Sequence, residues 1–205
     1  MRRNLQTMRT ERTTDMMKGH KHGAREDIRL GFLNVNGLTT PKYLEMCEEV
    51  RGGIDLFVIM ETFWRTNRQK DMEDWVLLEK RRERESKRGG GIMMIGKGQQ
   101  ELKEIQTEGE DILACEWRIR GTKIVLVGVY WDVREKRKNV ECKKEIERIL
   151  SEYRDEAVVI VGDMNAHLES LDGRKNVNTE VLEDLLTENA LVCVNLTEKC
   201  EGNWR

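Results

Sequence analysis

The chain has no long hydrophobic run, and none of its apolar stretches approaches the roughly 20 residues that a membrane-spanning helix requires. No apolar segment follows Arg2 and Arg3, so the N-terminus lacks the pattern of a secretory signal. These absences argue against a chain that spans a membrane or is exported. We therefore expect no membrane partner.

The cysteines form no closely spaced pair. They are Cys47, Cys115, Cys142, Cys193 and Cys200, with no Cys-x-x-Cys motif and no histidine at zinc spacing. An odd, widely spaced set favours reduced and mostly buried thiols over a metal site or a disulfide framework. Reduced thiols are typical of a nuclear or cytoplasmic protein, which is the location we expect.

An excess of charge is also missing, although charge is plentiful. Charged residues make up 36% of the chain, but 36 Lys and Arg against 38 Asp and Glu give a formal net charge of -2. Net charge therefore neither favours nor excludes a nucleic-acid partner, and any basic footprint must be local. The densest basic run, residues 80–88, contains interleaved Glu, which favours a solvated loop slightly over a contact with a DNA backbone.

The 205 residues suffice for one sizeable α/β domain, because a chain of this length buries roughly 70% of its extended surface. Residues 1–26 are polar and show neither helical nor strand periodicity. We interpret them as a disordered lead-in, with a transit peptide or a nucleic-acid-binding arm as alternatives. Residues 27–205 are predicted to form the domain.

The regular part begins as strand, helix, strand and then changes to consecutive strands. Apolar runs predict strands at 28–33, 54–60, 75–78, 91–95, 112–117, 124–129, 157–161 and 191–194. Helical spacing predicts helices at 41–50, 140–153 and 179–188. Consecutive strands without helices between them pair antiparallel, so the sheet is expected to be mixed and not doubly wound.

Polar side chains stand at the ends of the predicted strands. They are Asn34, Glu61, Tyr130, and Asp163 with Asn165. If these strand ends lie on one side of a sheet, the groups converge. Hard oxygen donors with one or two carboxylates suit Mg²⁺ (or Mn²⁺), which keeps several waters and completes its shell from a substrate phosphate. The chemistry indicated is hydrolysis of a phosphodiester.

Two of these segments also have a purely structural interpretation. Asp163 and Asn165 follow Gly162 in a tight turn, and such residues often hydrogen-bond a turn after a strand. Asn36-Gly37 has the composition of a tight turn, and for Asn36 a turn and a site residue are equally good interpretations. The presence of Glu61 at another strand end favours the site for Asp163 and Asn165.

In order and spacing these motifs resemble the endonuclease/exonuclease/phosphatase superfamily, and in particular the apurinic/apyrimidinic-endonuclease-like domain of non-LTR retrotransposons. The motifs are Asn34-Val35-Asn36-Gly37-Leu38, Glu61-Thr62, the Gly89-Gly90-Gly91-Ile92 run, Tyr130 and Gly162-Asp163-Met164-Asn165-Ala166-His167. The resemblance covers residues 28–205. It implies a deoxyribonuclease-I-like, four-layered α/β sandwich with two packed mixed, largely antiparallel sheets. It also implies a reverse-transcriptase-associated endonuclease that nicks DNA with a divalent metal, as a monomer and without a small-molecule cofactor.

The resemblance also assigns roles at the metal and at the phosphate. Glu61 would bind Mg²⁺ (or Mn²⁺) directly, with Asn36 close to the metal or its waters. Asn34 would hydrogen-bond nearby, and Asp163 would orient or deprotonate the attacking water. Asn165 would hold the scissile phosphate.

Two further residues receive roles with alternatives. Tyr130 would stabilise phosphate charge or serve as an ordinary aromatic at a strand end. His167 would contact the substrate or pack within the loop, and a replacement role for a missing catalytic histidine is a minority interpretation.

The sequence departs from the family pattern in two places. Trp131 follows Tyr130 where a proline is usual. Family members continue to a further Asp and a terminal Ser-Asp-His, which this chain does not reach, so we expect a domain without its last strands and an impaired enzyme. The alternative is a catalytically dead remnant that binds DNA or protein, and a cousin acting on phosphoinositides or other phosphoesters ranks lower.

Overall fold

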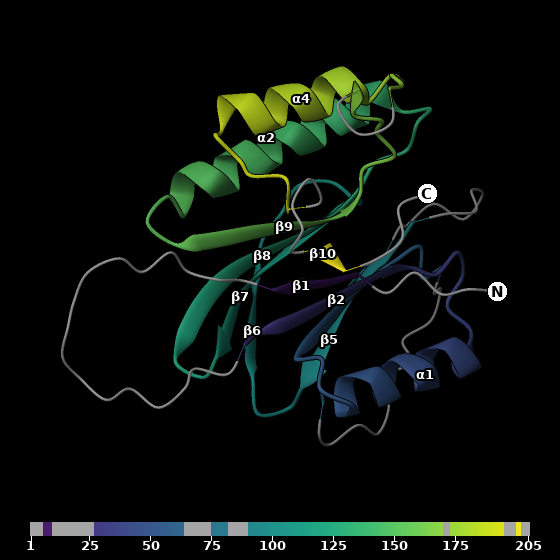
Figure 1. The fold of residues 1–205 in the computed structure, drawn as a ribbon, viewed down its shortest axis with the longest axis vertical. Coiled ribbons are helices and arrows are strands. Elements are labelled where there is room, and N and C mark those ends of the chain that lie inside the picture. Colours follow the sequence, from purple (N-terminus) through teal and green to yellow (C-terminus); the bar gives the residue numbers. More distant parts are fainter. Residues whose placement is uncertain are drawn as a thin grey trace.

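The structure is a computed structural model that describes residues 6–9, 27–63, 75–81, 90–169, 173–194 and 200–201. Two β-sheets pack face to face between layers of helices (Figure 1). The six-stranded sheet has the order β10-β1-β2-β3-β5-β4, and the four-stranded sheet has the order β6-β7-β8-β9. Most of the basic run at 80–88 lies outside the described residues, as does much of the predicted lead-in.

The six-stranded sheet contains β1 (Gln6–Arg9), β2 (Arg29–Asn34), β3 (Leu56–Met60), β4 (Trp75–Lys80), β5 (Ile92–Lys97) and β10 (Cys200–Glu201). The four-stranded sheet contains β6 (Glu101–Ile105), β7 (Ile112–Ile119), β8 (Thr122–Tyr130) and β9 (Ala157–Asp163). The helices are α1 (Thr40–Arg51), α2 (Lys136–Glu152) and α4 (Thr179–Glu188). Among the described residues, no helix is both long and apolar enough to cross a membrane.

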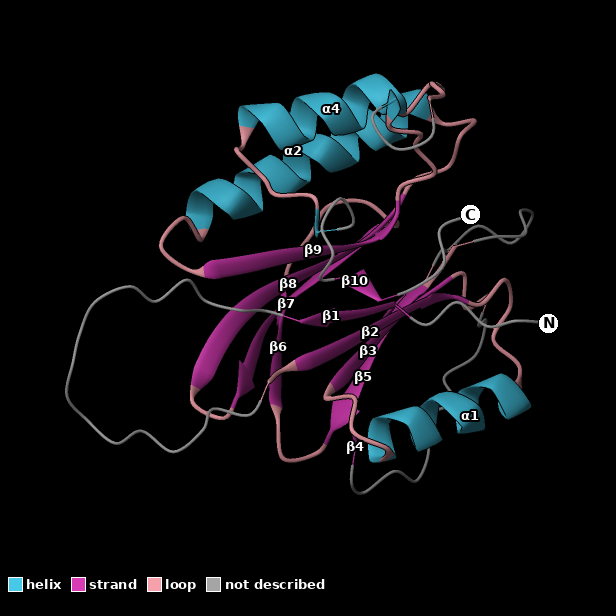
Figure 2. Ribbon diagram, in the orientation of Figure 1, coloured by secondary structure: helices cyan, strands magenta, loops and turns pink. Residues whose placement is uncertain are grey.

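Each sheet contains one parallel pair, and a helix makes the crossover in both cases. β2 pairs with β3 through α1, and β8 pairs with β9 through α2, whereas the other strand pairs are antiparallel. A parallel pair needs a long crossover, which a helix supplies while it covers the sheet face. Figure 2 shows the result, with α1 on the outer face of one sheet and α2 and α4 on the outer face of the other.

Three apolar layers hold the sandwich together. Side chains such as Val58, Met94 and Leu126 fill the space between the sheets. α1 packs against one outer face, and Ile146 of α2 and Leu185 of α4 pack against the other. β3 and β5 are buried on both faces, which explains why their sequences are continuous apolar runs. The predicted four-layered sandwich of mixed sheets is confirmed.

The predicted strand at 191–194 is wrong. Ala190 has a positive φ of 50°, and the Leu191 amide donates to the Leu186 carbonyl, so this segment ends α4 as a hydrogen-bonded turn. Leu191 packs on the helix-covered face of the four-stranded sheet, whereas Val192 is 77% exposed. The apolar run therefore terminates a helix and does not extend a sheet.

Three strands lie where the sequence pattern predicted none. β6 is rich in charge and largely exposed, which conceals its strand character. Residues 6–9 lie within the predicted lead-in but form β1, antiparallel to β2, and β10 pairs with β1. Backbone groups along the edge of β2 can pair with another strand whatever its side-chain pattern. The rest of residues 1–26 lies outside the described residues.

Candidate active site

The ends of four strands meet at one end of the sandwich. In the parallel pairs, Asn34 lies opposite Met60 and Tyr130 lies opposite Asp163, so β2 ends beside β3 and β8 ends beside β9. The side chains that follow these strands touch across the two sheets. This end of the sandwich contains all of the strand-end residues that the sequence singled out.

Asn34 joins the two sheets at this point. Its Nδ2 donates to Glu61 Oε1 at 3.1 Å and to Asp163 Oδ2 at 2.8 Å, while its Oδ1 accepts the Asn36 amide at 3.0 Å. A carboxamide nitrogen has two hydrogens, so one group serves two carboxylates. The network also fixes which way the amide faces, because a flipped amide would point its oxygen at both carboxylates.

Glu61 occupies a strained backbone conformation. Its φ is 56°, in the left-handed region that costs a residue with a side chain about 1–2 kcal/mol. Its carbonyl accepts the Gly37 amide at 2.8 Å, and the next carbonyl, that of Thr62, accepts Leu38 at 2.9 Å. These bonds to the loop after β2 hold the strained turn and direct the Glu61 carboxylate toward Asn34. Backbone strain of this kind concentrates at functional sites.

Asn36 lies on a turn that a lysine supports. Lys42 Nζ donates to the carbonyls on both sides of it, Val35 O at 2.6 Å and Gly37 O at 3.0 Å. Asn36 has φ 43° and is exposed. The turn and the site interpretations are therefore compatible, because the turn presents Asn36 to solvent beside Asn34.

Tyr130 is held as a neutral hydroxyl. Burial raises its pKa well above the usual range, and a hydrogen bond to Glu61 and the nearby charges of Asp132 and Asp163 raise the pKa further. A protonated phenol can donate a hydrogen bond to an anion. The Tyr130 amide donates to Asp111 O at 2.9 Å, so the β6–β7 loop fixes the end of β8.

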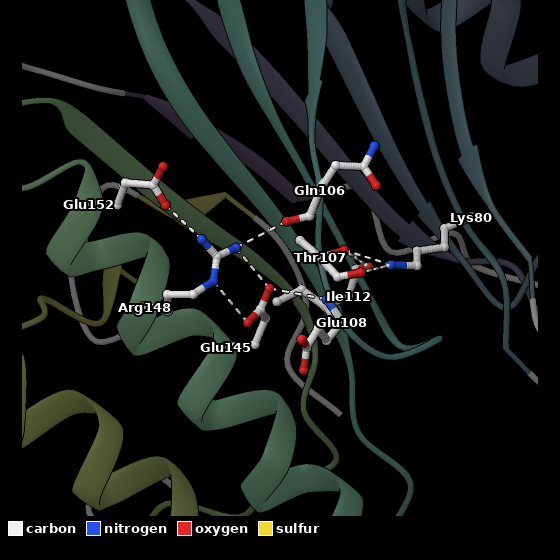
Figure 3. Close-up of polar contacts among 8 residues, drawn as sticks. All are labelled: Lys80, Gln106, Thr107, Glu108, Ile112, Glu145, Arg148 and Glu152. Carbon is white, nitrogen blue, oxygen red and sulfur yellow. Dashed lines mark hydrogen bonds and ion pairs between the residues drawn. The ribbon is translucent and has the colours of Figure 1, made fainter.

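That loop, residues 106–111, is held between β4 and α2 (Figure 3). Lys80 Nζ at the end of β4 donates to Thr107 O at 2.8 Å and to Thr107 Oγ1 at 2.6 Å. On the other side, Glu145 Oε1 of α2 accepts the Glu108 amide at 3.1 Å, and Arg148 donates to both oxygens of Glu145. Burial lowers the pKa of Lys80 against the opposing effect of nearby carboxylates. These contacts fix the loop whose Asp111 carbonyl accepts the Tyr130 amide.

Asp163 takes part in both the turn and the site. Its Oδ1 accepts the Asn165 amide at 3.1 Å, which makes the turn, and its Oδ2 accepts Asn34. Gly162 is required just before it, because a Cβ there would lie 1.8 Å from Val129 O of β8. The close approach of the two strands thus sets the position of Asp163.

Asn165 is fixed at both its main chain and its side chain. It has φ 45°, and its Nδ2 donates to Trp131 O at 2.8 Å, which leaves the second Nδ2 hydrogen for another acceptor. Trp131 is fully buried and donates its amide to Asp163 O at 2.9 Å. His167 lies on the same loop, where its carbonyl accepts Thr179 Oγ1 at 2.6 Å. Its substrate contact stays a prediction.

The sequence reasoning missed the residues that hold the site from behind. These are Lys42, Trp131, Asn139, Asn176, Asn178 and Thr179. The alternating pair Asn176 and Asn178 directly before α4 was the available signal, because asparagines in that position bind either a helix end or a neighbouring loop.

The donor set fits a hard divalent cation. Glu61 and Asp163 share a single neutral donor, and no lysine or arginine of the described segments forms an ion pair with either carboxylate. Within those same segments there is no group of three His, Cys, Asp or Glu side chains that would enclose a metal. Mg²⁺ needs only one or two carboxylates, because it retains waters and binds substrate phosphate. The assignment of Glu61 and Asn36 to the metal stays a prediction.

The fold and this arrangement define the class of the protein. It has the fold of the endonuclease/exonuclease/phosphatase superfamily, and residues 124–204 match the family model described as Endonuclease-reverse transcriptase. No curated protein has a matching sequence.

Solved structures share this fold. The endonuclease domain of TRAS1, a telomere-specific non-LTR retrotransposon, aligns with TM-score 0.63 and 14% identity over 79% of this chain and 70% of that chain. An AP endonuclease from Archaeoglobus fulgidus aligns with TM-score 0.55 and 13% identity over 78% and 70% of the two chains. A 3'-5' exonuclease from Neisseria meningitidis aligns with TM-score 0.57 and 13% identity over 77% of this chain and 70% of that chain. These likenesses confirm the fold that the predicted resemblance implies.

Proposed function

We propose that this chain is a divalent-metal-dependent DNA endonuclease domain that hydrolyses a phosphodiester bond. The observation that carries the proposal is the bridge that Asn34 makes between Glu61 and Asp163 across the two sheets. It places two carboxylates beside a neutral phenol and a turn asparagine, which is a site for an anionic substrate and a cation together.

The similar proteins support DNA as the proposed substrate. The aligned TRAS1 structure is the endonuclease domain of a non-LTR retrotransposon, and the family model that matches residues 124–204 is described as Endonuclease-reverse transcriptase. The corresponding activity for this chain is nicking of target DNA to leave a 3′-hydroxyl that primes reverse transcription. We expect a monomer, in the nucleus or cytoplasm, that requires no small-molecule cofactor.

The residues divide the work between metal and phosphate. Mg²⁺ or Mn²⁺, bound by Glu61 with Asn36 beside it, would neutralise charge on the phosphate. Asp163 orients the attacking water or accepts its proton. As the water oxygen bonds to phosphorus, the bond from phosphorus to the 3′-oxygen breaks, and that oxygen takes up a proton from solvent. The second Nδ2 hydrogen of Asn165 donates to a phosphate oxygen, where negative charge increases in the transition state, and the Tyr130 hydroxyl does the same once it turns from Glu61 to the substrate.

Nicking of supercoiled plasmid by the purified chain tests this function. We expect open-circular product in Mg²⁺, none in EDTA, and a loss of about 10²–10⁴-fold in Glu61→Gln. Asp55→Asn is the matched control, because Asp55 is a buried carboxylate at the opposite end of β3. Extension of the nick by a DNA polymerase would show the 3′-hydroxyl.

The plasmid experiment also distinguishes the alternatives. A folded protein that binds DNA equally well in Mg²⁺ and EDTA but does not cut would contradict the proposal and favour a non-catalytic binding module. Release of inorganic phosphate from a small phosphoester, without nicking, would favour a phosphatase.

A further inference from the structure

The turn at Asn165 depends on a buried network of asparagine side chains. Its carbonyl accepts Asn176 Nδ2 at 2.7 Å and Asn178 Nδ2 at 3.3 Å. Asn178 Nδ2 also donates to Met164 O at 3.0 Å. Two consecutive carbonyls of the site loop are therefore held by amides from the segment that precedes α4. These contacts support the left-handed conformation of Asn165.

Asn178 lies at the centre of the network. It is 0% exposed, and its Oδ1 accepts Asn139 Nδ2 of α2 at 2.8 Å. Asn139 Nδ2 also donates to Asp132 O at 2.8 Å, in the loop that follows β8. A continuous chain of hydrogen bonds therefore runs from the loop after Tyr130, through α2 and the start of α4, to Asn165. α2 and α4 lie side by side above β9 in Figure 1.

Asn178 stands at the start of α4, but its side chain does not cap that helix. It occupies the N-cap position, where an asparagine side chain normally accepts a hydrogen bond from the first turn of its own helix. Here its side chain makes no such cap hydrogen bond and binds the site loop instead. The residue thus gives up a common stabilising contact for one that orders Met164 and Asn165.

We propose that Asn178 is a positioning residue that acts through Asn165, so that the start of α4 determines the geometry of phosphate binding. The inference rests on the proposed nuclease function for its kinetic consequence, but not for its structural one. Without the Asn178 amide, the Met164 carbonyl loses this donor and the Asn165 carbonyl keeps only that of Asn176. The turn is then less firmly held, and the Asn165 side chain that we assign to the phosphate is displaced with it.

The test uses two substitutions at Asn178 and one control. Asn178→Ala removes the side chain, whereas Asn178→Asp keeps the shape and the acceptor for Asn139 but loses both donors. Neither substitution removes a cap hydrogen bond of α4, because the Asn178 side chain makes none, and urea unfolding of each variant checks that the domain stays folded. Asn189→Ala is the control, because Asn189 Nδ2 donates to Leu185 O at 3.0 Å at the other end of α4.

With an oligonucleotide substrate in Mg²⁺, we expect both Asn178 variants to lose up to about 10²-fold in kcat, and Asn189→Ala to keep its rate. In an Asn165→Ala background, Asn178→Asp should have almost no further effect, because its action passes through Asn165. A general loss of stability would lower activity in that background as well. Wild-type kcat in a folded Asn178→Asp variant, or an undiminished effect beside Asn165→Ala, would overturn the proposal.

Amide hydrogen exchange tests the same inference without any activity. Faster exchange at residues 163–167 in Asn178→Asp, with unchanged exchange in Asn189→Ala, is the expected result. If the wild-type chain does not nick DNA, the proposed function fails while this measurement still decides the positioning role. Unchanged exchange in Asn178→Asp would overturn that role.

Discussion

The two ends of the sandwich treat buried charge in opposite ways. At the end where β3 begins, Asp55 is 2% exposed, and its two oxygens accept Arg120 NH2 at 2.5 Å and the Arg29 amide at 2.8 Å. At the end where β3 finishes, Glu61 and Asp163 share the one neutral Asn34 amide. One end neutralises its carboxylate with a cation, and the other keeps two carboxylates without a cation among the described residues.

The backbone differs between the ends in the same sense. Near Asp55, positive φ values fall at Gly53, just after α1, and at Arg120 and Gly121, which form the tight turn between β7 and β8, where such values fit the hairpin. At the site end, the residues with positive φ include Asn36, Glu61 and Asn165, to which we assign the chemistry. We call the Asp55 end the latch, because its ion pair stabilises the sandwich. At the site end, the carboxylates without a cation and the strained backbone lower the stability of the fold but suit the proposed chemistry.

Replacing a side-chain amide by a carboxylate at each end should give the largest difference in the free energy of unfolding. Asn34→Asp would place a third carboxylate between two others, and we expect the free energy of unfolding in EDTA to fall by about 2–4 kcal/mol. Mg²⁺ should restore part of it. At the latch, Gln100 Nε2 donates to Asp55 O, and Gln100→Glu should cost about 1–2 kcal/mol with no response to Mg²⁺. Urea unfolding measures both, and equal losses of Asn34→Asp with and without Mg²⁺ would contradict the comparison.

Neutralising one carboxylate at each end should give opposite effects on stability. Asp55→Asn weakens the bonds to Arg120, which is partly exposed, so we expect a loss of about 1–2 kcal/mol with nicking retained. Glu61→Gln removes like-charge repulsion and should leave stability equal or up to about 1 kcal/mol higher, with nicking lost. Thermal unfolding with a nicking assay measures both properties. A Glu61→Gln variant destabilised as much as Asp55→Asn would refute the distinction.

Divalent metal should stabilise the chain through the site end alone. At ten times its dissociation constant, a ligand of the native state adds about 1.4 kcal/mol. We expect Mg²⁺ to raise the unfolding temperature of the wild type and of Asp55→Asn, but not of Glu61→Gln. Calorimetric scans in Mg²⁺ and EDTA provide the measurement, and a shift of equal size in Glu61→Gln would place the metal elsewhere.

Alkaline pH should reveal the buried phenol with the smallest effect. The folded pKa of Tyr130 is raised, chiefly by burial, above the value of about 10 in the unfolded chain. Its contribution to stability is therefore complete below pH ~10 and is lost as pH rises toward the folded pKa. Between pH 8 and 10.5 we expect Tyr130→Phe to lose less stability than the wild type, by under about 1 kcal/mol. Parallel losses in urea unfolding would show that Tyr130 ionises freely.

The fold was predictable wherever burial left a clear pattern. Strands such as β3 and β8 are buried and apolar, so their sequences predicted both the strands and the polar residues at their ends. The sequence pattern did not predict β6, because an exposed edge strand does not need an apolar pattern. The run at 191–194 misled because apolar residues also pack where a helix ends.

The candidate site divides in the same manner. Asp163 and Glu61 were predictable because they follow strands directly, and parallel pairing brings such ends together. Asn178 and Trp131 were not, because they act through contacts with main-chain carbonyls or through a carbonyl of their own. Such contacts depend on how loops meet in three dimensions, which local sequence does not encode.

The bridge at Asn34 has a consequence for the chain as it is synthesised. Asn34 and Asp163 are separated by 129 positions, and they come from different sheets. Contacts between distant segments form late, because a long loop must close before they stabilise anything. A nascent chain still attached to the ribosome therefore contains Asn34 and Glu61 well before Asp163 has been synthesised and can complete the pair of carboxylates. Cutting ability would appear abruptly, only once the second sheet has docked onto the first.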